Sequence, residues 1–166
     1  ILRNPTFLAF ALLAAATYGG LFTLLAASSF VFIRLMELSR IEYGVLMFAI
    51  VLAYVGGTLL CRRLLVRFGV QRTVAIGGVF SLAGGSLLGL GGLAGLEGVW
   101  PILLPALIYM VGHGIHQPCG QAGAVGPFPK AAGAASAMSG FLMMVVAFAV
   151  GQWLGASMDA TPLPMT

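Results

Sequence analysis

The side chains best able to do chemistry gather in one short stretch of an otherwise apolar segment, residues 109–121. On a helical wheel with about 100° per residue, measured from His113, they share an arc of about 140°. An imidazole changes its charge near neutral pH. The stripe therefore predicts either a surface that contacts a substrate or a set of hydrogen bonds between helices. Its members are Tyr109, His113, His116, Gln117 and Gln121.

Metal binding and catalysis are both disfavoured for this stretch. His113, His116 and Cys119 could suggest a soft-metal site, but Cys119 lies about 120° from His113 on the wheel. The rest of the chain offers no second cluster of metal-binding residue types. Both histidines occupy one segment. Six serines of the apolar runs have no base near them in sequence: Ser28, Ser29, Ser81, Ser86, Ser136 and Ser139. We therefore expect no enzyme activity and no metal or other cofactor, and we favour protonation as the role of the imidazoles.

Long apolar runs must position this stripe. Eight Lys or Arg and four Asp or Glu are the only charged residues among 166, or 7%, whereas a soluble domain has about 25%. A bilayer-spanning helix needs about 20 mostly apolar residues, and five uncharged runs meet or nearly meet that length. The chain is thus predicted to be a single all-α, polytopic membrane domain over residues 1–166. Its five transmembrane helices are expected at about 6–33, 43–61, 73–96, 100–125 and 131–158.

The charges between these runs predict an orientation. If the connections alternate between two sides, one side receives six basic residues and no acid: Arg3, Arg62, Arg63, Arg67, Arg72 and Lys130. The other receives all four acids with Arg34 and Arg40. Basic loops stay in the cytoplasm, so the first side is expected there and the location is a bacterial inner membrane. Because topology accounts for the basic excess, we expect the lipid bilayer as a partner and no nucleic acid.

Small residues and prolines shape the predicted helices. The pairs Gly85/Gly89, Gly91/Gly95 and Gly151/Gly155 place glycines one turn apart, a spacing that lets membrane helices approach closely. Pro118 removes a helical hydrogen bond and is expected to kink its helix beside the polar stripe. Tyr18 could offer an aromatic surface to an apolar substrate, although packing against lipid or other helices is the favoured interpretation.

A family resemblance begins at the turn after the polar stripe. Pro127, Phe128, Pro129 and Lys130 are followed by the small-residue run Ala-Gly-Ala-Ala-Ser-Ala at 132–137. This segment resembles the stretch between the tenth and eleventh helices of major facilitator drug/proton antiporters of the bicyclomycin- and chloramphenicol-resistance type. Two prolines stop one helix there, and the lysine marks the cytoplasmic side.

Two weaker matches lie in register with the first. The segment 28–33, Ser-Ser-Phe-Val-Phe-Ile, is similar to the Ser-Pro-Phe-Val end of the family's seventh helix, with Ser29 where proline is usual. The segment 57–72 is similar to the superfamily's cytoplasmic loop motif, although Val66 stands where an aspartate is usual. The motif residues kept are Gly57, Arg67, Gly69 and Arg72.

The resemblance implies that the five spans are helices seven to eleven of twelve, part of one six-helix half. It implies a secondary transporter that exports small amphipathic drugs by alternating access, coupled to protons. Its partners would be the small-molecule substrate and the other helices of the same transporter, namely the N-terminal half and a last helix. A metabolite carrier and a non-transporting structural partner stay open as alternatives. The residues expected to line the substrate cavity are His113, His116, Gln117, Gln121, Tyr109 and Tyr18.

Overall fold

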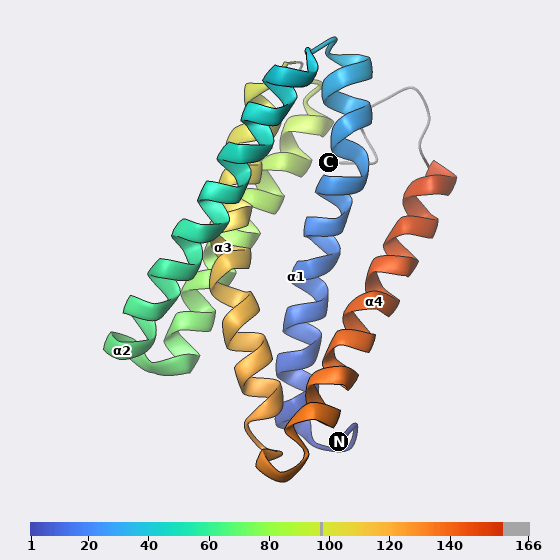
Figure 1. Cartoon of the computed structure of the whole chain (residues 1–166). Coiled ribbons are helices and arrows are strands. Elements are labelled where there is room, and N and C mark those ends of the chain that lie inside the picture. The colour runs from blue at the N-terminus through green and yellow to red at the C-terminus, as the bar shows by residue number, and fades with distance from the viewer. Residues whose placement is uncertain (97, 158–166) are drawn as a thin grey trace.

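Helices make up every secondary-structure element in the described part of the chain (Figure 1). The computed structural model describes residues 1–96 and 98–157. Within these residues, three helical stretches are long and apolar enough to cross a membrane: Pro5–Leu35, Arg40–Leu93 and Pro129–Ala156. The elements are α1 (Pro5–Ser29), the π-helix η1 (Phe30–Leu35), α2 (Arg40–Leu93), α3 (Trp100–Val125), the 3-10 turn η2 (Pro129–Ala131) and α4 (Ala132–Ser157).

The prediction of five separate helices is not confirmed, because the described residues form four α-helices. The predicted ranges 43–61 and 73–96 both belong to α2. Its helical pattern is broken only at Gly69, with φ 72° and ψ 176°, a conformation that side chains other than glycine rarely adopt. Around this residue the chain reverses into a first arm, 40–68, and a second arm, 70–93 (Figure 1). Residues 62–72, which separate the two predicted spans, are therefore helical except at one glycine, in keeping with the good helix propensity of arginine and leucine.

Local signals explain the other helix boundaries. The prediction 100–125 matches α3, which has Pro101 in its first turn and ends before Gly126. Helix α2 begins at Arg40 rather than 43 because Ser39 and Glu42 form a capping box, each side chain accepting from the other's backbone N–H. Residue 158, the predicted end of the last span, lies outside the described residues.

Helix α3 is the central element of the bundle. It packs against α2, α1 and α4, and α1 also packs against α4. It is absent from the three stretches that are apolar enough to cross a membrane, since it carries the two histidines and two glutamines of the polar stripe. The helix that carries the polar stripe is thus the one that the others enclose, as expected where polar groups must avoid lipid.

The charges separate between the two ends of the bundle. The N-terminus, the reversal of α2 and the connection from α3 to α4 lie at one end (Figure 1). These three segments carry the six basic residues that the sequence assigns to one side. The connections from α1 to α2 and from α2 to α3 lie at the opposite end (Figure 1). Of the four acids, Glu37 and Glu42 fall at that second end, while Glu97 and Asp159 are outside the described residues.

Glycines bring both arms of α2 against the backbone of α3. A Cβ on Gly57 would overlap the carbonyl oxygen of Val111 and lie 2.9 Å from its Cα. Reciprocally, a Cβ on Gly112 would lie 2.8 Å from the carbonyl oxygen of Gly77. Among the glycine pairs noted in the sequence, Gly91 is buried on the second arm, whereas a Cβ on Gly85 would meet nothing within 4 Å. On this arm, a seven-residue spacing marks the buried glycines: Gly77, Gly84 and Gly91.

Two thiols are in contact where the first arm of α2 packs against α3. The Sγ atoms of Cys61 and Cys119 are 3.5 Å apart, and both residues are buried free cysteines. They pack with Ile115 in one apolar cluster. A disulfide requires the sulfurs to approach to about 2 Å. A small movement of the two side chains would bring the Sγ atoms within this bonding distance.

We expect a membrane-permeant oxidant, copper phenanthroline, to link Cys61 to Cys119 within the chain. After denaturation both thiols would resist alkylation, and the intact mass would fall by two hydrogen atoms. The variants Cys61→Ser and Cys119→Ser would each keep one reactive thiol, and dithiothreitol would restore both in the unmodified chain. Two thiols that stay alkylatable after oxidation would contradict the packing of the first arm against α3.

Candidate functional site

His113 lies in the interior of the bundle with its Nδ1 nitrogen unsatisfied. It is 2% exposed, and its ring packs against that of Tyr54 on the first arm of α2, with centroids 5.6 Å apart. Its Nδ1 atom is buried and has no hydrogen-bond partner among the described residues. A buried polar atom without a partner costs about 1–3 kcal/mol. The unsatisfied Nδ1 of His113 therefore costs stability in this state.

His116 is bound to the second arm of α2. Its Nε2 lies 3.0 Å from the carbonyl oxygen of Val74, and its Nδ1 lies 3.4 Å from the hydroxyl of Ser81. These contacts favour the tautomer in which Nε2 carries the hydrogen and Nδ1 accepts. The ring occupies the space left by the absent side chain of Gly77, where a Cβ would lie 2.8 Å from Nε2. The sequence predicted either substrate contact or hydrogen bonds between helices for the stripe. His116 makes hydrogen bonds between helices.

The two glutamines face α4. The Nε2 of Gln121 lies 3.4 Å from the Sδ of Met143, and the Nε2 of Gln117 lies 4.0 Å from the same sulfur. A thioether is a weak acceptor, so these contacts satisfy the amides poorly. The Oε1 of Gln117 is buried and has no partner within the described part of the chain. Because Gln117 follows His113 by one helical turn, two unsatisfied side chains share one face of α3.

The two predicted tyrosines both make contacts between helices. The hydroxyl of Tyr109 donates to the carbonyl oxygen of Thr17 on α1 at 2.8 Å. Tyr18 is half-buried and packs against a cluster of Ala14, Ala15 and Met143. Tyr109 therefore holds α1 against α3, and Tyr18 contributes to the contact between α1 and α4.

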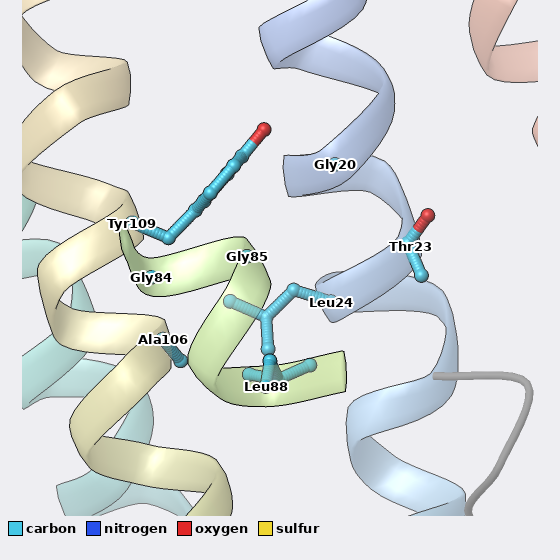
Figure 2. A pocket seen from close by; sticks show the side chains of 8 residues that line it. All are labelled: Gly20, Thr23, Leu24, Gly84, Gly85, Leu88, Ala106 and Tyr109. Carbon is cyan, nitrogen blue, oxygen red and sulfur yellow. The ribbon is translucent and has the colours of Figure 1, made fainter. Parts of the chain in front are cut away.

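A cleft of about 160 Å³ opens beside Tyr109, between α1, the second arm of α2 and α3 (Figure 2). Among the stripe residues, only Tyr109 lines it. The side chains of Leu24 and Leu88 lie at one end of it, and the ring of Tyr109 lies at the other. The remaining lining residues are Gly20, Thr23, Gly84, Gly85 and Ala106.

The predicted loop motif does not form one compact cluster. Gly69 is at the reversal of α2, and Arg67 and Arg72 flank it with exposed side chains. The guanidinium of Arg67 lies 5.1 Å from the centroid of the Phe68 ring. Gly57 is buried more than three helical turns before the reversal and packs against α3. Its role in the structure is helix packing rather than turn formation.

The predicted turn and kink residues lie between and within the last two helices. Pro127 belongs to the turn after α3, and Pro129 and Lys130 are in η2. Phe128 anchors this turn by an edge-on contact with Phe7, with ring centroids 6.1 Å apart. Helix α3 continues across Pro118.

Sequence reasoning missed the partners of the stripe. Tyr54, Ser81 and Met143 contact His113, His116 and the glutamines respectively, yet each is an ordinary residue of an apolar run. The one available signal was the seven-residue spacing of Gly77, Gly84 and Gly91, which marks the face of α2 that approaches α3. No spacing rule connects Cys61 with Cys119 or His113 with Tyr54, because those contacts depend on how the hairpin folds back.

The comparisons with known proteins leave the family open. No family model, no curated protein and no solved structure matches this chain. The resemblance to major facilitator antiporters therefore rests on the turn at 127–130 and the two weaker segments alone. A function for the chain is therefore inferred from the contacts and unsatisfied atoms of the site.

Proposed function

We propose that this chain is the greater part of the C-terminal half of a secondary transporter of the major facilitator type. The observation that carries the proposal is the pair of unsatisfied buried atoms on the central helix, Nδ1 of His113 and Oε1 of Gln117. Within a membrane, polar groups that find no partner are expensive and are typical of substrate or ion pathways. Hydrogen bonding to a transported molecule would satisfy both atoms.

Five crossings are part of this proposal, with each arm of α2 counted as one. At a rise of 1.5 Å per residue, either arm exceeds the roughly 30 Å of a bilayer's hydrocarbon core. Gly69 and its flanking arginines would then lie at the cytoplasmic surface of a bacterial inner membrane. The end with Arg3 and Lys130 would share that surface, in keeping with the retention of basic loops in the cytoplasm.

The proposed activity is export of small amphipathic drugs, with proton coupling implied only by the resemblance. The substrate would contact His113 and Gln117, with Gln121 beside them, and the N-terminal half of the same transporter would form the opposite wall. A last helix would complete the six-helix half. A carrier of a metabolite would use the same stripe, and uptake against efflux of labelled compounds in membrane vesicles separates the two.

The third possibility is a membrane protein that supports assembly and transports nothing. In that case the unsatisfied atoms of the stripe would pair with a protein partner rather than a solute. Transport by the 166-residue chain alone would instead indicate a functional assembly of several copies.

Removing both unsatisfied groups tests the cavity assignment. In a drug-sensitive bacterial host expressing the whole transporter, we expect the double variant His113→Ala/Gln117→Ala to lower drug efflux by about tenfold or more. Two hydrogen bonds of about 1 kcal/mol each account for this magnitude. The control is Thr58→Val, since the Thr58 hydroxyl already donates to the carbonyl oxygen of Tyr54 in its own helix. Undiminished efflux in the double variant, at equal protein level, would refute the assignment.

A further inference from the structure

The cleft beside Tyr109 is separate from the unsatisfied face of α3. His113 and Gln117 do not line it, and their contacts lie toward Tyr54 and Met143. Its walls come from three helical segments that are distant in sequence: α1, the second arm of α2, and α3 (Figure 2). A ligand here would touch all three at once.

The lining offers no free hydrogen-bond donor from a side chain and no charge. The Tyr109 hydroxyl donates to Thr17, and the Thr23 hydroxyl donates to the carbonyl oxygen of Gly19 at 3.0 Å. The backbone of the three lining glycines belongs to helices, so its N–H groups are engaged. The other lining side chains are Leu24, Leu88 and Ala106. A charged or strongly accepting ligand would lose its hydration without compensation.

The size of the cleft sets the size of the ligand. Its volume is about 160 Å³, and an engineered apolar cavity of about 150 Å³ in another protein accommodates benzene. The three glycines differ in how they shape the space. A Cβ on Gly20 would overlap Tyr109, and one on Gly84 would lie 2.5 Å from the Tyr109 backbone nitrogen, whereas one on Gly85 would meet nothing within 4 Å. Gly85 therefore borders the open part of the cleft.

We propose that this cleft binds a hydrocarbon group about the size of one six-membered ring. The group can be part of a small molecule or a segment of a lipid acyl chain, and the experiment separates these two sources. Burial of the group would derive its free energy from the apolar surface of Leu24, Leu88 and the Tyr109 ring. The proposal does not depend on transport, because binding is measured on the chain itself.

Photolabelling of the full chain in phospholipid nanodiscs tests the proposal. The probe is 3-trifluoromethyl-3-phenyldiazirine, and peptide mass spectrometry locates the label. We expect labelling at 23–24 and 85–88 that excess toluene suppresses, while labelling of lipid-facing Leu82, which is 72% exposed, resists toluene. In a parallel experiment, a phospholipid carries the diazirine on its acyl chain. Cleft labelling by that lipid identifies an acyl chain as the occupant, and labelling by the phenyl probe alone identifies a small molecule.

Matched glycine variants show whether the cleft itself is responsible. Gly85→Val fills the open part and is expected to lower toluene-sensitive labelling about tenfold, the effect of excluding one or two CH2-sized groups. Gly78→Val is the control, since Gly78 lies seven residues earlier on the same arm and also has open space for a Cβ. Gly85→Ala, a smaller change, should give an intermediate loss if the valine variant folds poorly. Labelling of the cleft that resists toluene would overturn the proposal. So would labelling of the cleft that equals the labelling of Leu82 in every variant.

Discussion

Replacing Gly57 by alanine is expected to destabilise the bundle by about 3 kcal/mol, the upper range for overpacking a buried site. The added Cβ would meet the carbonyl oxygen, Cα and carbonyl carbon of Val111. These are backbone atoms of the central helix, so no side-chain rotation can relieve the overlap. Instead the first arm of α2 would have to move away from α3, and its contacts near Cys61 and Cys119 would weaken.

The neighbouring glycine supplies the control. Gly56 is exposed and has nothing within 4 Å of an added Cβ, so Gly56→Ala should leave stability unchanged or raise it by up to about 1 kcal/mol through helix propensity. Unfolding of both variants by sodium dodecyl sulfate from mild detergent micelles, followed by circular dichroism, gives the comparison. Equal stabilities for the two variants would show that the first arm does not pack against α3 at Gly57.

Replacing either histidine of the stripe by leucine should change the stability of the bundle, but in opposite directions for the two residues. His116→Leu removes two contacts with the second arm, to Val74 and Ser81, and is expected to cost about 2–3 kcal/mol. His113→Leu removes a buried Nδ1 without a partner among the described residues. That change should leave stability unchanged or raise it by about 1 kcal/mol, because the avoided desolvation cost outweighs the lost ring contact with Tyr54.

For His113, efflux and stability should change in opposite directions. A side chain that costs stability and is still present is typical of a functional site. We therefore expect His113→Leu to lower efflux by the whole transporter about fivefold, the effect of losing one hydrogen bond of about 1 kcal/mol, while the detergent-unfolding midpoint holds or increases. If His113→Leu costs as much stability as His116→Leu, His113 is a structural residue. The transport proposal would then lose its main support.

Much of the helical layout could be predicted because membrane helices leave strong local signals. The bounds of α3 follow from Trp100-Pro101 at its start and Gly126-Pro127 after its end. The separation of charges predicted which connections share an end of the bundle, and the chain path in Figure 1 agrees with it. The reversal of α2 was predicted with too long a loop. Hydropathy reports where charges interrupt an apolar run, whereas a tight reversal needs only one residue with a positive φ.

The site was predicted as a stripe but not as a division of roles. Periodicity placed His113, His116 and Gln117 on one arc of one helix, and that depends only on helix geometry. It could not tell that Gly77 makes room for His116 between Val74 and Ser81, or that His113 is left with an unsatisfied nitrogen. Those outcomes depend on which helices surround each side of α3.

By itself the sequence determined that the chain forms apolar helices, that six of its eight basic residues share one end, and that polar groups line one face of α3. All three are local properties, set by composition and by the repeat of a single helix. Only the tertiary structure decided which polar atoms find partners, which glycines touch a backbone and where a cleft remains. The physical reason is that a hydrogen bond or a void needs two or more segments at one place, and their meeting depends on the packing of the whole bundle.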